Sequence, residues 1–396
     1  MKKVIVYRNT LLPYSETFIR AQVLSYRRWD AVLAGAERLP GADLEGLTTL
    51  LLGKGRPSVS GRVFRRVRER LGYAAPSIVA QLDREAAQLA HVHFGTDAVR
   101  IWPVLRRLTI PVIVTLHGYD INTYKEWWEQ GHGGRGRRTY PSKLLAMADH
   151  ANVTFVAVSE AIRQRAIDFG IPGEKVFTKY IGVDVSRFVP GGLPIPKRKR
   201  QVLYVGRMVE KKGGNILIEA FARVRQQAPT ARLVMAGDGP LLGEFKRLAR
   251  RLNVPVKFLG KTPVNEVKRQ IDKSRVFCLP SITARNGDAE GLPISVLEAQ
   301  ACGVPVVTSA RGGATEGIRH GRTGFAFQEG DVQALESALL RLLSDDALVA
   351  QMTEAAQAHV RARFDLRKCT AALEELYDRT AASGTRMKGA AARLGQ

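Results

Sequence analysis

Two glutamates frame a short helix that the sequence predicts in the second half of the chain. The string that carries them reads EGLPISVLEAQACG, from Glu290 to Gly303. Proline is favoured in the first turn of a helix and glycine just past its end, so we expect a helix from Pro293 to Ala301. Glu290 then lies in the loop before this helix, and Glu298 lies within it.

This arrangement suits the diphosphate of a nucleotide. The backbone N–H groups of Gly291 and Leu292 lie at the predicted helix N-terminus, where the helix dipole offers about half a positive charge to an anion. The carboxylate of Glu298 is able to accept hydrogen bonds from both hydroxyls of a ribose. Taken singly, Glu290 and Glu298 would be ordinary solvated residues, but the complete string favours a ligand-binding role for both.

A second string, GRMVEKKG from Gly206 to Gly213, follows the predicted strand Val202–Val205. It places Arg207 and Lys212 at the carboxyl end of that strand, the edge where open α/β sheets bind their ligands. Two fixed cations there would neutralise the charge that develops on a departing diphosphate, usually the largest contribution to such catalysis. Basic residues that merely face solvent are the alternative, and the position at a strand end favours function.

Two glycines follow another predicted strand, Arg232–Ala236. Gly237 and Gly239 flank Asp238, and glycine lets a backbone approach a ligand closely, although the same tripeptide also makes an ordinary turn. The string is not the phosphate loop GxxxxGK[ST], and no GxGxxG follows the first strand of the chain. An ATPase and a dehydrogenase are therefore disfavoured.

In the first half, the string HGYD begins at His117, just after the predicted strand Val112–Thr115. A histidine at a strand end, beside a loop rich in glycine and arginine that contains Trp127 and Trp128, is placed to contact a substrate hydroxyl. A structural histidine is the alternative. His93 ends another predicted strand, and the sequence leaves its role open between site and core.

The elements that position these residues alternate between short β-branched runs and stretches of helical period. That alternation predicts parallel sheets covered by helices, an α/β fold of two Rossmann-like domains. The expected strands of the first half lie at 4–7, 31–34, 48–52, 91–94, 112–115, 155–158 and 176–180, and those of the second half at 202–205, 232–236, 256–259, 276–279, 304–308 and 324–327. Ser159 and Glu160 are expected to cap the helix that follows them.

Composition and sequence punctuation give the domain boundaries. Proline, glycine and a tetrabasic run make 189–200 a linker between a first domain, 1–188, and a second, 201–360. Residues 361–383 have a helical pattern and are expected to return to the first domain. The basic Gly/Ala tail, 384–396, is expected to be disordered.

The chain has 396 residues and a net charge of +24, which points to an anionic partner. No helix-turn-helix, zinc finger or RNP-like aromatic string accompanies the charge, so nucleic acid is disfavoured. The three cysteines are widely spaced, which indicates reduced thiols rather than a zinc site, and the first nine residues are too short an apolar run for a signal peptide. We expect a cytoplasmic protein.

An arginine-rich stretch, 56–70, has apolar residues at helical spacing and could dock on an anionic membrane surface. Each basic residue near such a surface contributes about 1 kcal/mol, enough in combination for reversible, peripheral attachment to the inner face of the plasma membrane. A solvated helix face is the equally weighted alternative.

Four strings together resemble the family-four retaining glycosyltransferases of the GT-B group, and in particular exopolysaccharide and lipopolysaccharide transferases of the colanic acid and amylovoran type. They are HGYD at His117, GRMVEKKG at Gly206, AGDGP at Ala236 and EGLPISVLEAQACGVPVV at Glu290. The resemblance implies two Rossmann-like domains whose parallel sheets face each other across a cleft. The loop after the first strand, Asn9–Phe18, departs from the glycine pair common in the family and makes the acceptor side the looser part of the match.

The resemblance also implies roles for the residues. Arg207 and Lys212 would hold the diphosphate, Glu298 the ribose, and Glu290 the donor sugar with help from the amides of Gly291 and Leu292. The base would lie near the loops after Gly237 and Leu259, and Gly237, Asp238 and Gly239 would help to bind the donor. His117 would lie near the transferred sugar and the acceptor.

By the same resemblance, the reaction is a metal-independent transfer from a UDP- or GDP-linked sugar to a glycan or lipid-linked acceptor, with retention of configuration and no further cofactor. Two alternatives remain. A sugar-nucleotide 2-epimerase shares the GT-B architecture and needs no acceptor, and a non-catalytic protein could bind polyanions through its positive charge alone.

Overall fold

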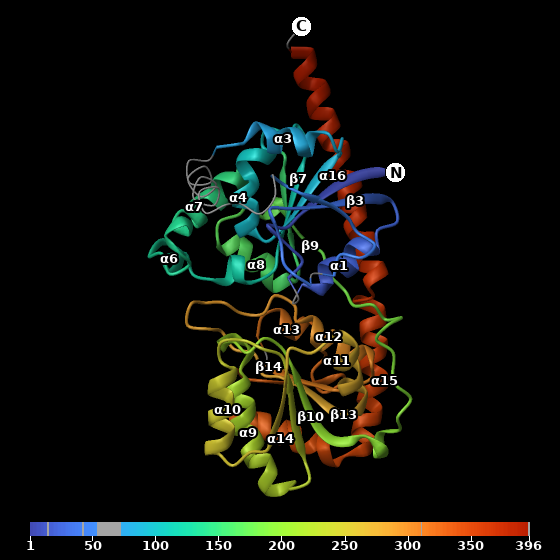
Figure 1. Ribbon diagram of the computed structural model, residues 1–396. Coiled ribbons are helices and arrows are strands. Elements are labelled where there is room, and N and C mark those ends of the chain that lie inside the picture. Colours follow the sequence, from blue (N-terminus) through green and yellow to red (C-terminus); the bar gives the residue numbers. More distant parts are fainter. Residues whose placement is uncertain (14–15, 42, 54–72, 310, 395–396) are drawn as a thin grey trace. The chain divides into compact units, whose positions relative to one another are not determined.

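The computed structural model describes residues 1–13, 16–41, 43–53, 73–309 and 311–394, with the backbone alone for 384–394. The chain folds into two compact units (Figure 1). The first comprises Met1–Ile181 together with Arg367–Gln396, and the second comprises Gly182–Leu366. Each unit is built around its own parallel sheet, as the alternation of strands and helices predicts.

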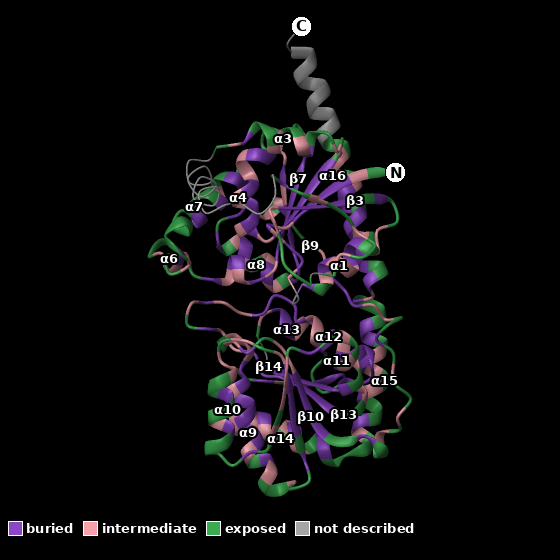
Figure 2. Ribbon diagram, in the orientation of Figure 1, coloured by how far each residue is buried: buried purple, intermediate pink, exposed green. Residues whose placement is uncertain are grey.

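The first unit has a seven-stranded parallel sheet in the order β5-β3-β1-β6-β7-β8-β9. These strands are β5 (Thr48–Leu51), β3 (Trp29–Gly35), β1 (Lys2–Tyr7), β6 (Leu89–His93), β7 (Val112–Leu116), β8 (Val153–Ala157) and β9 (Val176–Thr178). The central strands are almost entirely buried because helices cover both faces (Figure 2), and they are mostly apolar, although β6 also carries His91 and His93. The chain order reverses between β1 and β6, and the carboxyl ends of that pair are where doubly wound sheets bind ligands.

Helices and a small ribbon complete the first unit. The helices are α1 (Thr17–Leu24), α3 (Pro76–Asp83), α4 (Gly95–Leu105), α5 (Tyr119–Asn122), α6 (Lys125–Glu129), α7 (Tyr140–Ala148), α8 (Glu160–Asp168) and α16 (Leu366–Leu394), and the ribbon pairs β2 (Thr10–Leu11) with β4 (Glu37–Arg38). Ser159 caps α8, because its side chain accepts a hydrogen bond from the backbone N–H of Ile162, which confirms the expected cap.

The second unit repeats the same order with six strands, β12-β11-β10-β13-β14-β15. They are β12 (Val256–Gly260), β11 (Arg232–Ala236), β10 (Lys199–Val205), β13 (Ser274–Leu279), β14 (Val306–Ser309) and β15 (Gly324–Phe327). The helices are α9 (Gly214–Gln227), α10 (Leu242–Arg251), α11 (Val264–Lys273), α12 (Ile294–Ala301), α13 (Gly313–Glu316), α14 (Val332–Ser344) and α15 (Asp346–Arg363). Here the chain order reverses between β10 and β13, whose carboxyl ends carry the two strings richest in charge.

Helix α16 lies at the end of the chain but packs on the rest of the first unit, which is formed by residues 1–181 (Figure 1). Tyr377 is fully buried in the core that contains Trp29, and their rings meet edge to face at 5.5 Å. The carboxylate of Glu374 accepts hydrogen bonds from the backbone N–H groups of Arg27 and Arg28 at 2.9 and 2.8 Å. These contacts attach the end of the chain to the start of β3.

Two expected boundaries differ from the structure. Residues 189–200 belong to the second unit: β10 begins at Lys199, and the largely buried Arg198 donates a hydrogen bond to the carbonyl oxygen of Gly303 at 2.8 Å. Proline and glycine exclude regular structure there but do not prevent packing. Helix α16 continues to Leu394 where disorder was expected, because alanine, arginine, lysine, methionine and leucine are strong helix formers.

Candidate functional site

The loops that follow β10 and β13 are joined by two ion pairs. Lys212 Nζ lies 2.8 Å from Glu290 Oε1, and Lys211 Nζ lies 2.9 Å from Asp288 Oδ1. All four side chains are largely buried, with 7 to 18% of each exposed. The two consecutive lysines therefore hold the segment from Asp288 to Glu290 against the carboxyl edge of the sheet.

Glu290 is ionised in this setting. Burial alone would raise the pKa of its carboxyl group, but the charges of Lys212 and Lys211 and the hydrogen bonds from Lys212 and Ser281 lower it below its ordinary value. The Ser281 hydroxyl donates to Glu290 Oε1 at 3.3 Å. Lys212 and Ser281 thus fix the buried carboxylate at the carboxyl end of β13.

Helix α12 begins beside these ion pairs. It runs from Ile294 to Ala301 with Pro293 at its N-cap position, close to the interval expected from the sequence. The Ser295 hydroxyl donates to the carbonyl oxygen of Val205, the last residue of β10, at 3.2 Å. The N-terminus of α12, with the buried Gly291 and Leu292 before it, therefore lies at the carboxyl end of β10.

Arg207 is the exposed cation of the group. It lies two residues past β10, and its guanidinium forms no ion pair with any residue that the structure describes. The backbone around it is fixed, because its carbonyl oxygen accepts hydrogen bonds from the Tyr204 hydroxyl at 3.2 Å and from the Val209 N–H at 2.9 Å. The side chain is left available for an anion.

Glu298 lies on α12 with its side chain partly exposed. Burial raises the pKa of its carboxyl group to about 7, against the opposing effect of the Arg187 guanidinium. At neutral pH this group is able both to donate and to accept a hydrogen bond, as a pair of vicinal hydroxyls would require.

The glycines of this edge let loop backbones pack directly on one another. Gly213 has φ +61°, and a Cβ there would lie 1.9 Å from the carbonyl oxygen of Pro280. Gly237 has φ +135°, and a Cβ there would lie 1.9 Å from the carbonyl oxygen of Gly206. Gly239 likewise lies against the backbone of Met208. The structure therefore gives these glycines a packing role, which brings the loop after β11 onto the loop that carries Arg207.

The loop after β11 also contains Asp238, which is exposed. Its carboxylate accepts a hydrogen bond from the N–H of Gly239 at 2.7 Å, and its carbonyl oxygen accepts one from the N–H of Met208 at 3.0 Å. The Asp238 side chain therefore shapes its own turn.

In the first unit, His117 follows β7 directly and is held by its neighbour Asp120. The fully buried Asp120 carboxylate accepts hydrogen bonds from the backbone N–H groups of His117 and Gly118, at 3.0 and 2.9 Å, and from that of Gly95 at 2.8 Å. Burial raises the pKa of Asp120, against the lowering effect of these donors and of the backbone N–H of Asp120 itself. The string HGYD is thus a closed turn that fixes the direction of the histidine.

A second histidine meets His117 from the adjacent strand. His93, the last residue of β6, is buried, and its Nδ1 lies 3.0 Å from His117 Nε2. His91 lies two residues earlier and hydrogen-bonds Thr115 through Nε2 at 2.6 Å. Burial lowers the pKa of all three imidazoles, to about 3 for His91, so all are neutral at physiological pH.

The loop after β1 lacks the glycine pair common in the family and contains a cluster of ion pairs around Arg8. Arg8 pairs with Glu16, with 2.6 Å between Nη2 and Oε1, and with Asp97 at the start of α4. The Asn9 N–H also donates to Asp97 Oδ2 at 2.8 Å. Ser15, which belongs to the same string, lies outside the described residues. Glu16 therefore serves a structural pair that the sequence did not reveal.

The Trp127–Trp128 pair that follows His117 is mainly structural. Trp128 is fully buried against the Tyr140 ring at 4.8 Å, while Trp127 is partly exposed and lies edge to face with Trp128 at 5.1 Å. Gly133 packs on the Trp128 ring, where a Cβ would lie 2.5 Å from its atoms. The aromatic pair therefore anchors the arginine-rich loop 131–138 to the unit.

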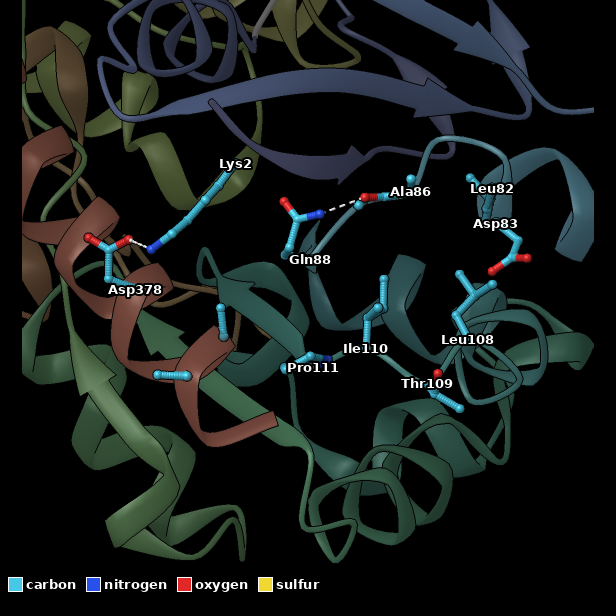
Figure 3. A pocket seen from close by; sticks show the side chains of 13 residues that line it. Lys2, Leu82, Asp83, Ala86, Gln88, Leu108, Thr109, Ile110, Pro111 and Asp378 are labelled. Carbon is cyan, nitrogen blue, oxygen red and sulfur yellow. Dashed lines mark hydrogen bonds and ion pairs between the residues drawn. The ribbon is translucent and has the colours of Figure 1, made fainter. Parts of the chain in front are cut away.

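A groove of about 560 Å³ lies at the opposite, amino edge of the first sheet (Figure 3). It is bordered by Lys2, by the loops before β6 and β7, and by α16. Two of its charged groups, Lys2 and Asp378, pair at 2.9 Å, and no residue of the four strings reaches it. The groove is therefore separate from the candidate site.

The sequence identified most of the site but missed Lys211 and Asp288. Lys211 lies inside the string GRMVEKKG, and Asp288 lies two residues before Glu290. The signal that would have found them is a second lysine and a second carboxylate spaced nearly like the first pair. Arg207, Lys212, Glu290 and the start of α12 lie together in the second unit, and Glu298 follows on α12. His117 and His93 lie together in the first unit.

Each unit is a doubly wound sheet with polar side chains at the carboxyl edge where the chain order reverses, which is where proteins of this architecture bind their ligands. The models of two families match adjacent parts of the chain, "Glycosyltransferase Family 4" over residues 11–187 and "Glycosyl transferases group 1" over residues 187–359. The amylovoran biosynthesis glycosyltransferase AmsK of Erwinia amylovora is 33% identical over 315 residues, which cover 77% of this chain and 74% of AmsK. The chain belongs to the family-four glycosyltransferases.

Further relatives agree with this family. WcaL of Salmonella typhimurium, assigned to colanic acid biosynthesis, is 33% identical over 202 residues, half of each chain. Among solved structures, HepE of Anabaena in complex with UDP and glucose superposes with a TM-score of 0.77 at 21% identity, over 96% of this chain and all of HepE. These likenesses confirm the expected GT-B fold and the likeness to the amylovoran and colanic acid type.

Within the described part of the chain, no helix combines the length and the apolar character needed to cross a bilayer. The arginine-rich stretch 56–70, on which the expectation of membrane docking depends, lies outside the described residues.

Proposed function

We propose that this glycosyltransferase moves a sugar from a nucleotide-diphosphate sugar to a growing, lipid-linked glycan of the exopolysaccharide or lipopolysaccharide kind, with retention of configuration. The observation that supports it best is the convergence of Arg207, Lys212 and the N-terminus of α12 on the carboxyl edge of β10 and β13. Positive groups gathered at a strand edge and a helix start suit a diphosphate. By their names, AmsK acts in amylovoran biosynthesis and WcaL in colanic acid biosynthesis, and HepE binds UDP.

Different residues of the second unit bind different parts of the donor. Arg207 and Lys212 hold the two phosphates, the N–H groups of Gly291 and Leu292 face the same anion, and Glu290 contacts the donor sugar. When the diphosphate binds, Lys212 keeps its contact with Glu290 and gains one with a phosphate oxygen, so that the ion pair pre-orients both groups.

Two further contacts complete donor binding. Glu298 takes the ribose hydroxyls, and its pKa of about 7 lets it hydrogen-bond them in either protonation state. The base lies near the loop that contains Gly237, Asp238 and Gly239, which packs on the loop of Arg207. His117, in the first unit, contacts the transferred sugar and the acceptor.

The reaction itself is a front-face displacement. The bond from the anomeric carbon to the diphosphate oxygen breaks, the acceptor oxygen forms its bond on the same face, and the acceptor proton passes to a phosphate oxygen of the departing nucleotide. Arg207, Lys212 and the α12 N-terminus stabilise the charge on the leaving group, so no metal ion is required. Activity that persists in excess EDTA, and a product with the anomeric configuration of the donor, are the expected results.

The acceptor and location follow from the proposed substrate. A lipid-linked glycan lies at the inner face of the plasma membrane, and we place the enzyme in the cytoplasm, attached peripherally through the stretch 56–70. Co-sedimentation with vesicles containing anionic lipid at low salt is expected, with release as salt rises.

A melting-temperature panel tests the donor assignment. UDP, GDP, ADP and TDP sugars are added in turn, and one is expected to raise the melting temperature because it binds only the folded protein. Release of an epimerised free sugar from that donor without acceptor would instead identify an epimerase. No shift with any nucleotide, and binding to polyanions that collapses with salt, would indicate a non-catalytic protein.

A further inference from the structure

Three buried side-chain nitrogens of the first unit have no hydrogen-bond partner among the described residues, and one of them lies beside His117. It is Nε2 of His93, whose side chain is 1% exposed. Buried polar atoms without partners are rare, and each asks for an explanation. The other ring nitrogen of His93 lies 3.0 Å from His117 Nε2, so the two facts together restrict where the protons of this pair reside.

Only one proton can lie between the two nitrogens. Both imidazoles are neutral, because burial and the nearby charge of Arg8 lower the pKa of each well below its ordinary value. If His117 donated from Nε2, the proton of His93 would sit on its own Nε2 and leave a buried N–H without a partner. If His93 donates from Nδ1, its Nε2 is an unprotonated acceptor, and an orphaned acceptor is the better tolerated of the two.

The ring of His117 has little freedom to avoid this contact. The Phe94 ring lies 4.3 Å from it, centroid to centroid, and the Phe18 ring lies 5.2 Å away. The Asp120 carboxylate accepts a hydrogen bond from the backbone N–H of His117 and so fixes the backbone at this residue. The edge of His117 that remains, once Nε2 is occupied by His93, is the one that carries Nδ1.

We propose that His93 is a positioning residue that donates Nδ1–H to His117 Nε2, and so fixes His117 as the tautomer that presents Nδ1–H to a sugar hydroxyl oxygen. His117 then acts as a hydrogen-bond donor to that oxygen rather than as a base. The consequence for catalysis rests on the proposed function, since it assumes that a sugar lies beside His117. The tautomer itself does not.

The tautomer is measured directly on the wild-type protein. Long-range ¹H–¹⁵N correlation spectra of a histidine-labelled sample distinguish protonated from bare ring nitrogens, and the His117→Gln variant identifies the signals among seven histidines. We expect Nδ1 protonated and Nε2 bare in His117, and the same pattern in His93. The exposed His132 and His150 provide reference signals. A proton on His117 Nε2 would overturn the proposal, whatever the enzyme transfers.

Kinetics test the consequence with two matched variants. His93→Phe keeps a ring of similar size but no donor, and kcat/KM for the acceptor is expected to fall about tenfold to a hundredfold, while the affinity for the nucleoside diphosphate stays unchanged. His93→Asn restores an N–H near the place of Nδ1 and is expected to recover most of the loss. Wild-type acceptor kinetics in a folded His93→Phe variant would refute the positioning role. If no donor supports turnover, the proposed function fails, while the spectra still decide the tautomer.

Discussion

The carboxyl edges of the two sheets have the same topology and opposite chemistry. In the second unit, Lys211 and Lys212 form ion pairs with Asp288 and Glu290, and the exposed Arg207 stands beside them. In the first unit, neutral histidines and a carboxylate held by three backbone N–H groups occupy the corresponding edge. On the proposed function, the edge of the second unit holds the anionic diphosphate of the donor, and the histidines of the first unit contact uncharged sugar hydroxyls.

The largest effect on activity is expected from removing the cations of the second unit. Arg207→Ala and Lys212→Ala are each expected to lower kcat by about 10³-fold, because the leaving diphosphate loses a positive partner in the transition state. Initial rates at saturating donor provide the measurement. Arg232→Ala and Lys246→Ala, exposed substitutions in the same unit, are matched controls that should retain wild-type rates. Near-normal activity in both single site variants would contradict the assignment.

A second prediction concerns the buried ion pair that the sequence did not reveal. Lys211→Met leaves the Asp288 carboxylate buried without its partner and is expected to lower the free energy of unfolding by about 3 kcal/mol, while adding Asp288→Asn recovers part of it. Urea denaturation monitors both. The exposed pair of Lys2 and Asp378 is the control, and Lys2→Met should cost less than about 1 kcal/mol. Equal losses in the two lysine variants would show that burial does not distinguish these pairs.

The corresponding prediction for the first unit concerns hydrogen bonds rather than an ion pair. Asp120→Asn replaces two acceptor oxygens by one, so at least one of three backbone N–H groups is left unsatisfied, and the free energy of unfolding should fall by about 2 kcal/mol. The loss should be nearly independent of salt, because no ion pair is broken. Thermal unfolding at low and high salt measures it, with the exposed Asp149→Asn as control. A loss that disappears in high salt would argue that charge, not hydrogen bonding, holds this turn.

The smallest expected effect is a dependence on pH at Glu298. Its folded pKa, about 7, lies above the ordinary value of 4.5, so the folded state retains a proton that the unfolded state releases between these pH values. Wild-type stability through this group is therefore full below pH 4.5 and is lost as pH rises to 7. Because the side chain is partly exposed, Glu298→Gln should gain only about 1–2 kcal/mol relative to wild type between pH 4.5 and 8. A difference that stays constant with pH would refute the raised pKa.

Much of the fold was accessible from local patterns. Each expected strand overlaps a strand of the structure, and the expected helix from Pro293 to Ala301 differs from α12 by one residue at its start. The glycines were harder to interpret. The sequence could not distinguish approach to a ligand from packing at Gly237, because the neighbour that excludes a Cβ, Gly206, belongs to another loop. The linker was misjudged because composition does not report tertiary contacts such as that between Arg198 and Gly303, and the tail because the helix propensity of its residues was given too little weight.

The sequence by itself determined the alternation of strands and helices and the strings that carry Arg207, Lys212, Glu290 and His117, because both depend on neighbours along the chain. Only the tertiary structure decided which side chains meet. Lys211 finds Asp288 across 77 residues, and His93 finds His117 across 24. Burial then sets their protonation. Parallel strands bring the ends of distant segments to one edge, and no pattern along the chain specifies the distance between two atoms there.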